Sequence, residues 1–151
     1  MNRHYTSIEQ SKKLLELGLS PETADMCWIT ENGGASYSIY PTAVPWKNYT
    51  AKDYYLPCWT AESLLDVLPN FIEHKRMGKQ VTSFLHIYYM SCSVLYEHTQ
   101  SEDNPHYFIL QMFENDSEDE YGLTYNVFRM VCWALGNKYI PKMWLKKGEV
   151  K

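Results

Sequence analysis

Near the N-terminus, apolar residues recur at the spacing of one helix face, and a second short helix follows. The apolar positions of the first helix are Ile8, Leu14, Leu15 and Leu17. Thr6 and Glu9 have the spacing of a capping box, in which two side chains satisfy free amides of the first turn. Gly18 suits the left-handed residue that often ends a helix. Ser20 followed by Pro21 predicts the second helix, because serine caps helices and proline fits their first position.

Residues 56–69 predict a short helix between two prolines, and most changes of pattern fall on either side of it. Thr60 can accept a hydrogen bond from an amide of the first turn, and Pro69 disfavours helical backbone in the residue before it. The apolar stripe of this helix comprises Leu64, Leu65 and Leu68. Trp59 precedes the cap, where a large apolar side chain packs back onto the first turn as in a hydrophobic staple.

Elsewhere, β-branched and aromatic residues alternate with other residues, which predicts strands. Residues 27–30 and 36–40 form a predicted hairpin, because Asn32, Gly33 and Gly34 between them supply positive φ angles for a tight turn. A predicted antiparallel meander of three strands consists of residues 81–89, 93–98 and 107–113.

Two segments between these elements lack a periodic pattern. Residues 41–56 are expected to form an ordered surface loop, and residues 70–80 a basic turn around Gly78. In the strand that follows the turn, both faces are apolar enough for a central strand. One of its faces carries Phe84, His86, Tyr88 and Met90.

A long amphipathic helix is predicted near the C-terminus. Ser117 and Glu120 have the spacing of another capping box, and Gly136 with Asn137 ends the pattern. The residues at helical spacing are Tyr121, Tyr125, Phe128, Val131, Cys132 and Leu135. A tail that begins at Pro141 is expected to fold back onto the core through Met143, Trp144 and Leu145. Together these elements predict one α+β domain over residues 1–151, with an antiparallel sheet (the hairpin plus the three-stranded meander) and helices packed on one face.

Charge and cysteine spacing narrow the classes of function. The formal net charge of −4 argues against a general phosphate-binding surface, so nucleic acid is not an expected partner. Two short basic clusters fit a solvated turn and the chain end: Lys75, Arg76 and Lys79, and Lys142, Lys146, Lys147 and Lys151. The chain has no apolar leader and no run of about 18 apolar residues, so no membrane segment is expected. The cysteines stand far apart, which predicts four free thiols in a cytoplasmic setting: Cys27, Cys58, Cys92 and Cys132.

Three sets of residues suggest chemistry but fit simpler explanations better. The acidic run from Glu114 to Glu120 lacks the glycine spacing of a calcium-binding EF-hand loop, and acidic residues are expected where a helix begins. His86 and His98 lie on strands that we pair, where they can approach each other, but they lack a metal-binding spacing. Cys58 precedes a helix N-terminus, which favours a thiolate, yet it suits a buried position. We therefore expect no catalytic residue, no metal and no cofactor.

The aromatic content is the positive signal for function. The chain has 13 Tyr, 5 Trp and 5 Phe, and aromatic residues are enriched at interfaces. The loop over residues 41–55 carries the predicted binding residues, Trp46, Tyr49, Tyr54 and Tyr55. The leading hypothesis is a non-enzymatic binding protein with a protein partner or self-association. Two alternatives stay open: a small enzyme whose site is assembled from residues distant in sequence, and nucleic-acid binding through the C-terminal lysines.

Four spaced blocks of sequence cover most of the chain. They are Ile8-Glu9-Gln10-Ser11 with Leu14-Leu15; Gly18-Leu19-Ser20-Pro21-Glu22-Thr23-Ala24-Asp25-Met26; Leu56-Pro57-Cys58-Trp59 with Leu64-Leu65 and Leu68-Pro69; and Met130-Val131-Cys132-Trp133-Ala134-Leu135. These blocks resemble a group of small proteins encoded in prophages and mobile elements of gut bacteria of the Bacteroides type. That group has no assigned activity, so the resemblance implies a cytoplasmic accessory protein of a mobile element and no particular chemistry.

Overall fold

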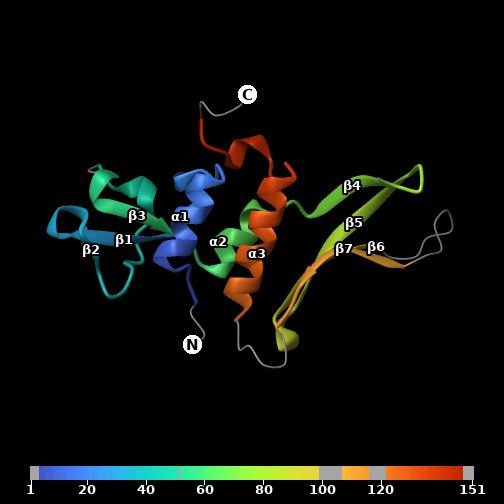
Figure 1. Ribbon diagram of the computed structural model, residues 1–151, viewed down its shortest axis with the longest axis horizontal. Helices are drawn as coiled ribbons and strands as arrows, with labels where there is room; N and C mark the ends of the chain where they lie inside the picture. Colours follow the sequence, from blue (N-terminus) through green and yellow to red (C-terminus); the bar gives the residue numbers. More distant parts are fainter. Residues whose placement is uncertain (1–3, 51, 99–106, 116–121, 148–151) are drawn as a thin grey trace.

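The computed structural model describes residues 4–50, 52–98, 107–115 and 122–147, and it confirms the predicted α+β class. In this part of the chain, seven strands form two antiparallel sheets (Figure 1). The α-helices are α1 (Ile8–Glu16), α2 (Ala61–Val67) and α3 (Leu123–Gly136). The strands are β1 (Met26–Glu31), β2 (Ser36–Tyr37), β3 (Tyr55–Cys58), β4 (Phe71–Arg76), β5 (Lys79–Tyr88), β6 (Ser93–His98) and β7 (Phe108–Phe113).

The helices separate the two sheets. The small sheet has the strand order β2-β1-β3, and the large sheet has the order β4-β5-β6-β7. In Figure 1 the small sheet lies to the left of the helices and the large sheet to the right, with the β4–β5 hairpin extending away from α3. Helix α3 contacts α2 as well as β6 and β7, whereas α1 contacts β3. Helix α3 therefore joins the large sheet to the rest of the molecule.

The predicted hairpin is confirmed, and a third strand is added to it. β1 and β2 pair around a turn in which Asn32 (φ 51°) and Gly34 (φ 94°) have left-handed backbone. Residues 55 and 56, predicted as the end of an irregular loop, instead begin β3, which pairs with β1. Pro57 lies within this strand because β3 is an edge strand, where a missing amide donor is tolerated.

The large sheet contains one strand more than the predicted meander. Residues 70–80, expected as a basic turn, form β4 and the start of β5, joined by Met77 (φ 52°) and Gly78 (φ 79°). Two positive φ angles in a two-residue loop match the twist of antiparallel strands. The prediction missed β4 because only Ile72 is buried in this strand and most of its other residues are exposed and polar.

Helix α1 begins one residue later than the predicted capping box. Ser7 Oγ accepts a hydrogen bond from Gln10 N at 3.1 Å, and Gln10 Oε1 accepts one from Ser7 N at 2.8 Å. Thr6, the predicted cap, is instead buried, and its hydroxyl accepts a hydrogen bond from Trp59 N at 3.0 Å. Glu9 is left exposed. Thr6 does not cap the helix because its hydroxyl is hydrogen-bonded to Trp59, which is distant in sequence.

The other helix ends largely follow the prediction. Thr60 caps α2, and Ser20 caps a 3₁₀ turn at Pro21–Thr23. Helix α3 ends at Gly136, while its predicted capping box at residues 117–120 lies outside the described residues. Among the described residues, no helix combines the length and the apolar character that crossing a membrane requires.

The C-terminal tail folds back onto the core through two of the three predicted residues. Trp144 and Leu145 pack against the buried cluster, and Leu145 forms an isolated antiparallel bridge with Leu19. Met143 is exposed instead. The bridge fixes the tail on the turn that follows α1.

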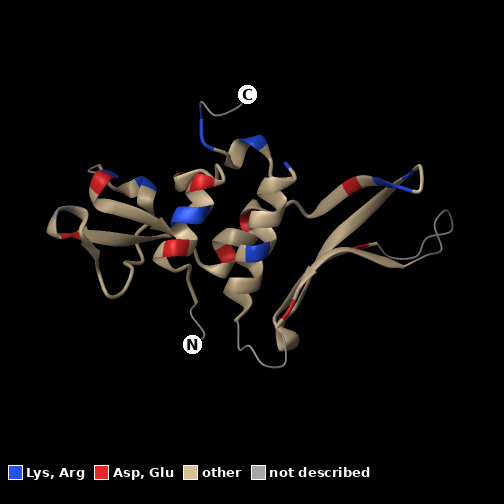
Figure 2. Cartoon of the chain, viewed as in Figure 1, with Lys and Arg blue, Asp and Glu red and all other residues tan. Residues whose placement is uncertain are grey.

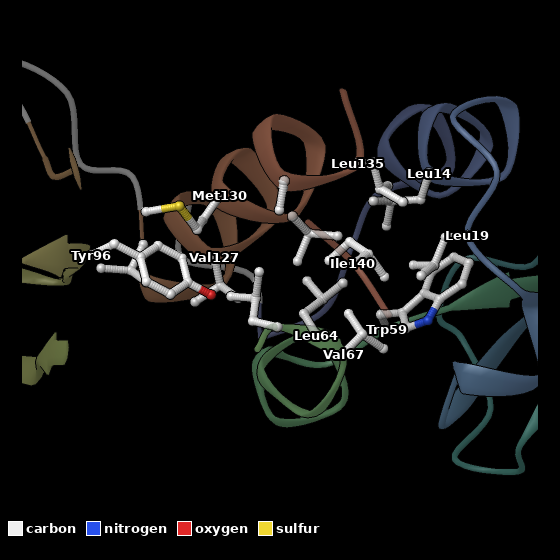
Figure 3. Close-up of a cluster of buried hydrophobic side chains, with 14 of the residues drawn as sticks. Leu14, Leu19, Trp59, Leu64, Val67, Tyr96, Val127, Met130, Leu135 and Ile140 are labelled. Atoms are coloured by element: carbon white, nitrogen blue, oxygen red, sulfur yellow. The ribbon is translucent and has the colours of Figure 1, made fainter. Parts of the chain in front are cut away.

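One buried cluster connects the three helices to the large sheet (Figure 3). Trp59 and Tyr96 lie toward its opposite ends in that view, and both are fully buried. The hydroxyl of Tyr96 donates to Pro69 O at 2.7 Å, so this polar group of the core is satisfied. Of the predicted α2 stripe, Leu64 and Leu68 are buried, and Leu65 is half-buried against the same cluster.

Candidate functional site

The large sheet has one face turned toward α3 and a second face on which side chains of β4, β5 and β7 are partly exposed and those of β6 are buried. Alternation along the strands assigns the side chains to these faces. Residues on the face toward α3 belong to or contact the buried cluster: Ile72, Leu85, Ile87, Val94, Tyr96 and Phe113. On the opposite face, successive register partners form a row across all four strands: Phe71, Phe84, Glu97 and Ile109.

We call this second face, with Phe71, Phe84, Tyr88, Tyr107 and Ile109, the open face. These five large side chains are each between 39% and 52% exposed. The rings of Phe71 and Phe84 lie 6.1 Å apart across neighbouring strands. Single exposed apolar residues are common on any protein, but neighbouring ones such as Phe71 and Phe84 form a candidate contact surface.

A buried carboxylate lies in the middle of the open face. Glu97 is only 6% exposed. The hydroxyl of Tyr107 donates to Glu97 Oε2 at 2.6 Å, and the hydroxyl of Tyr88 donates to Oε1 at 3.3 Å. His86 Nε2 lies 3.5 Å from the same Oε1, which is an ion pair when the imidazole is protonated. A carboxylate removed from water needs hydrogen bonds, and the two phenols provide them.

Glu97 raises the pKa values of the two tyrosines that donate hydrogen bonds to it. Its charge is the largest cause of the raised pKa of Tyr88, and its hydrogen bond is the largest cause of the raised pKa of Tyr107. Both phenols therefore keep their protons at neutral pH and remain donors. No lysine or arginine in the described ranges forms an ion pair with Glu97. Among the described residues, its charge is thus paired by His86 alone, and only when the imidazole is protonated.

A β-bulge brings Tyr107 and Glu97 onto the same face. Tyr96 pairs with Gln111 and Glu97 with Ile109, so Leu110 is an extra residue on β7. In a regular register Leu110 would lie opposite Glu97, and every earlier residue of β7 would change face, because side chains alternate with a period of two. The hydrogen bond between Tyr107 and Glu97 depends on that irregularity.

The two histidines whose close approach the sequence left open lie on opposite faces of the large sheet, so they do not meet. His86 is on the open face, whereas His98 is on the other face and donates from Nδ1 to Thr82 O at 2.9 Å. The ring of His98 stacks on Phe108, and its Nε2 is buried without a hydrogen-bond partner among the described residues. Within the described part of the chain, no three metal-ligating side chains gather at one point.

The four predicted binding residues of the 41–55 loop do not form one exposed surface. Trp46 packs partly against the buried core, and Lys52 Nζ lies 4.0 Å from the centroid of its ring. Tyr49 and Tyr55 are half-buried and stack on each other with centroids 3.6 Å apart. Tyr54 is exposed. The structure therefore brings two of the four together and leaves one free for a partner.

A separate pocket of about 480 Å³ lies between α2 and the start of α3. Its lining includes His4, Asp25, Glu62 and Cys92. The carboxylate of Asp25 accepts hydrogen bonds from the amide and hydroxyl of Thr60 and from the Ser63 hydroxyl. These bonds fix the first turn of α2, so the Asp25 carboxylate of the pocket already serves the fold.

Cys58 does not have the surroundings of a nucleophile. The side chain is fully buried, and its Sγ donates to Thr6 O at 3.4 Å. Burial is the main reason that the pKa of this thiol rises to about 12. A reactive cysteine needs the opposite, a lowered pKa and access for the substrate. All four cysteines are free, as predicted.

Sequence reasoning missed the open face as a site, although one signal for it was present. The alternation of Phe84, His86 and Tyr88 on one side of a strand is confirmed, but both faces of that strand were expected to be covered. Nothing in the local pattern showed which face α3 would leave open.

Comparison with protein-family models, with curated proteins and with solved structures gives no match for this chain.

Proposed function

We propose that this chain is a non-enzymatic binding protein whose open face takes up a segment of a partner protein. The observation that carries the proposal is the set of half-exposed apolar side chains that β4, β5 and β7 place on one face of the large sheet, on both sides of the buried Glu97. Aromatic side chains supply much of the contact energy at the centres of interfaces. The opposite side of the same sheet packs on α3, which holds the row in place before a partner arrives.

The runner-up function, a small enzyme, has one observation in its favour. His86 and Glu97 are distant in sequence and lie together, as an acid and a base in an active site would. The His86 side chain is 42% exposed, whereas a catalytic pair acts best where water is excluded. Binding is therefore the function that the geometry supports better.

The biological setting of the proposal comes from the sequence resemblance. We propose a cytoplasmic accessory protein of a mobile element that works by holding another protein. The net charge of −4 supports a protein partner over nucleic acid.

Replacing Phe71 and Phe84 together by alanine is expected to weaken peptide binding by about tenfold or more, because both rings are exposed for contact. The peptides come from selection of a displayed library of random short peptides on the wild-type protein. Affinities are then measured by fluorescence anisotropy. The double variant should stay folded, because half-exposed rings contribute less to stability than core residues; a thermal melt checks this.

The matched control is the double variant Trp46→Ala with Tyr54→Ala, which removes two aromatic rings from the 41–55 loop. This control is expected to leave peptide affinity unchanged. Loss of binding in the loop variant alone would move the interface to the loop. A library that yields no binding peptide at all would contradict the binding function itself.

A further inference from the structure

We infer that the open face selects partner segments that carry an arginine, with the Glu97 carboxylate as the counter-ion. The inference rests on the proposed function and adds the chemistry of the partner. The observation behind it is a buried negative charge in the centre of an aromatic surface. No cationic side chain of the described residues, other than a protonated His86, lies within ion-pairing distance of that charge.

The carboxylate of Glu97 has capacity for a further donor. An ionised carboxylate offers about four acceptor positions. Tyr88 and Tyr107 occupy two of them, and His86 lies at the longer distance of 3.5 Å. Taking a carboxylate out of water is unfavourable unless it is both hydrogen-bonded and paired with a cation. A partner that places a cation next to Glu97 supplies the missing ion pair.

An arginine fits the neighbours of Glu97 better than other cations do. Phe84 lies directly across from Glu97 on β5, and Ile109 lies across from it on β7. The guanidinium group is planar, binds carboxylates through paired N–H donors and stacks on aromatic rings. It is also weakly hydrated, so placing it among apolar side chains is less unfavourable than placing a lysine ammonium there.

The charges elsewhere on the large sheet leave this preference intact. On the open face of β4, Glu73 lies two residues along the strand from Phe71, and Lys75 lies two residues beyond Glu73. The basic tip of the β4–β5 hairpin, with Lys75, Arg76 and Lys79, is shown in blue in Figure 2. Four residues along a strand correspond to about 13 Å, which exceeds the screening length at physiological salt. Near Phe84 the local field is therefore negative, with contributions from Glu97 and from Glu73, which lies about 7 Å along the strand from Phe71.

The test compares three pools of synthetic heptapeptides in which the central residue is arginine, citrulline or glutamate. The flanking positions are the same random mixture of tyrosine, leucine and threonine in each pool. Citrulline has the shape of arginine without its charge, so the comparison isolates the ion pair. Binding to the wild-type protein, to Glu97→Gln and to Phe84→Ala is followed by fluorescence anisotropy.

We expect the arginine pool to bind the wild-type protein about tenfold more tightly than the citrulline pool. Glu97→Gln should remove most of this difference, so that the two pools bind the variant with similar affinity, whereas Phe84→Ala should weaken both pools. Equal binding of arginine and citrulline by the wild-type protein would overturn the inference even if Glu97→Gln failed to fold. Tighter binding of the glutamate pool would also overturn it and would assign selectivity to the basic tip. Absence of binding by any pool would instead count against the proposed function.

Discussion

Trp59→Ala is expected to lower the free energy of unfolding by about 4 kcal/mol, because removing a fully buried tryptophan leaves a cavity in the core. The indole Nε1 also donates to Thr23 Oγ1 at 2.9 Å, so the substitution removes this hydrogen bond, while the Thr23 hydroxyl still donates to Ser20 O. Trp59 lies in the cluster shared by the helices and the large sheet (Figure 3), so both parts should lose stability together. Urea denaturation followed by circular dichroism measures the effect.

Two control variants separate the contributions at this position. Trp59→Phe keeps most of the ring volume and loses the indole hydrogen bond, so it should cost about half as much or less. Met143→Ala changes an exposed side chain and should alter stability by less than about 0.5 kcal/mol. A loss below about 1.5 kcal/mol in Trp59→Ala would contradict the tight packing of this core.

Alkaline pH is expected to destabilise the fold through Cys58. Burial raises the pKa of this thiol from 9.0 to about 12 in the folded protein. Between these values the unfolded chain loses the proton and the folded chain keeps it. The contribution of the buried thiol is therefore intact below pH 9 and falls by about 1.4 kcal/mol per pH unit above it. At pH 10.5 the loss from this residue amounts to about 2 kcal/mol.

Cys58→Ala is the variant that tests this linkage. The free energy of unfolding is measured by urea denaturation at pH 8 and at pH 10.5 for the wild-type protein and the variant. The fall between the two pH values should be smaller by about 2 kcal/mol in the variant. The thiols of Cys27 and Cys132, whose pKa values burial raises to about 11, are present in both proteins and cancel in the comparison. Parallel falls in the two proteins would show that Cys58 is not held protonated.

Local sequence was enough to predict the structure where a residue interacts with the backbone of its neighbours in the chain or sets its own φ angle. Thr60 was predicted as the cap of α2, and its hydroxyl accepts a hydrogen bond from Ser63 N. Asn32 and Gly34 were predicted to reverse the chain, and both have positive φ. The one-residue error at α1 shows the limit of such reasoning. Thr6 has the spacing of a cap, but its hydroxyl is bonded to Trp59, which lies far along the chain.

The candidate site was predictable only in part. Alternation placed Phe84, His86 and Tyr88 together, since successive side chains of a strand point to opposite faces. The partner strand carrying Phe71 was missed because its exposed residues are mostly polar. Glu97 gave no signal at all in the sequence. Its contact with Tyr107 depends on one extra residue in β7, and no local preference predicts such a register shift.

The sequence by itself determined the α+β class, the turns and most helix ends, because these depend on neighbouring residues and on the period of the apolar pattern. Only the tertiary structure decided which face of the large sheet stays open and which polar groups meet on it. That outcome depends on how α3 packs against β6 and β7 and on the register between β6 and β7. Both are set by contacts between residues far apart in the chain. A periodic pattern indicates that a face is apolar. It does not show whether other elements of the same chain or a partner protein will cover that face.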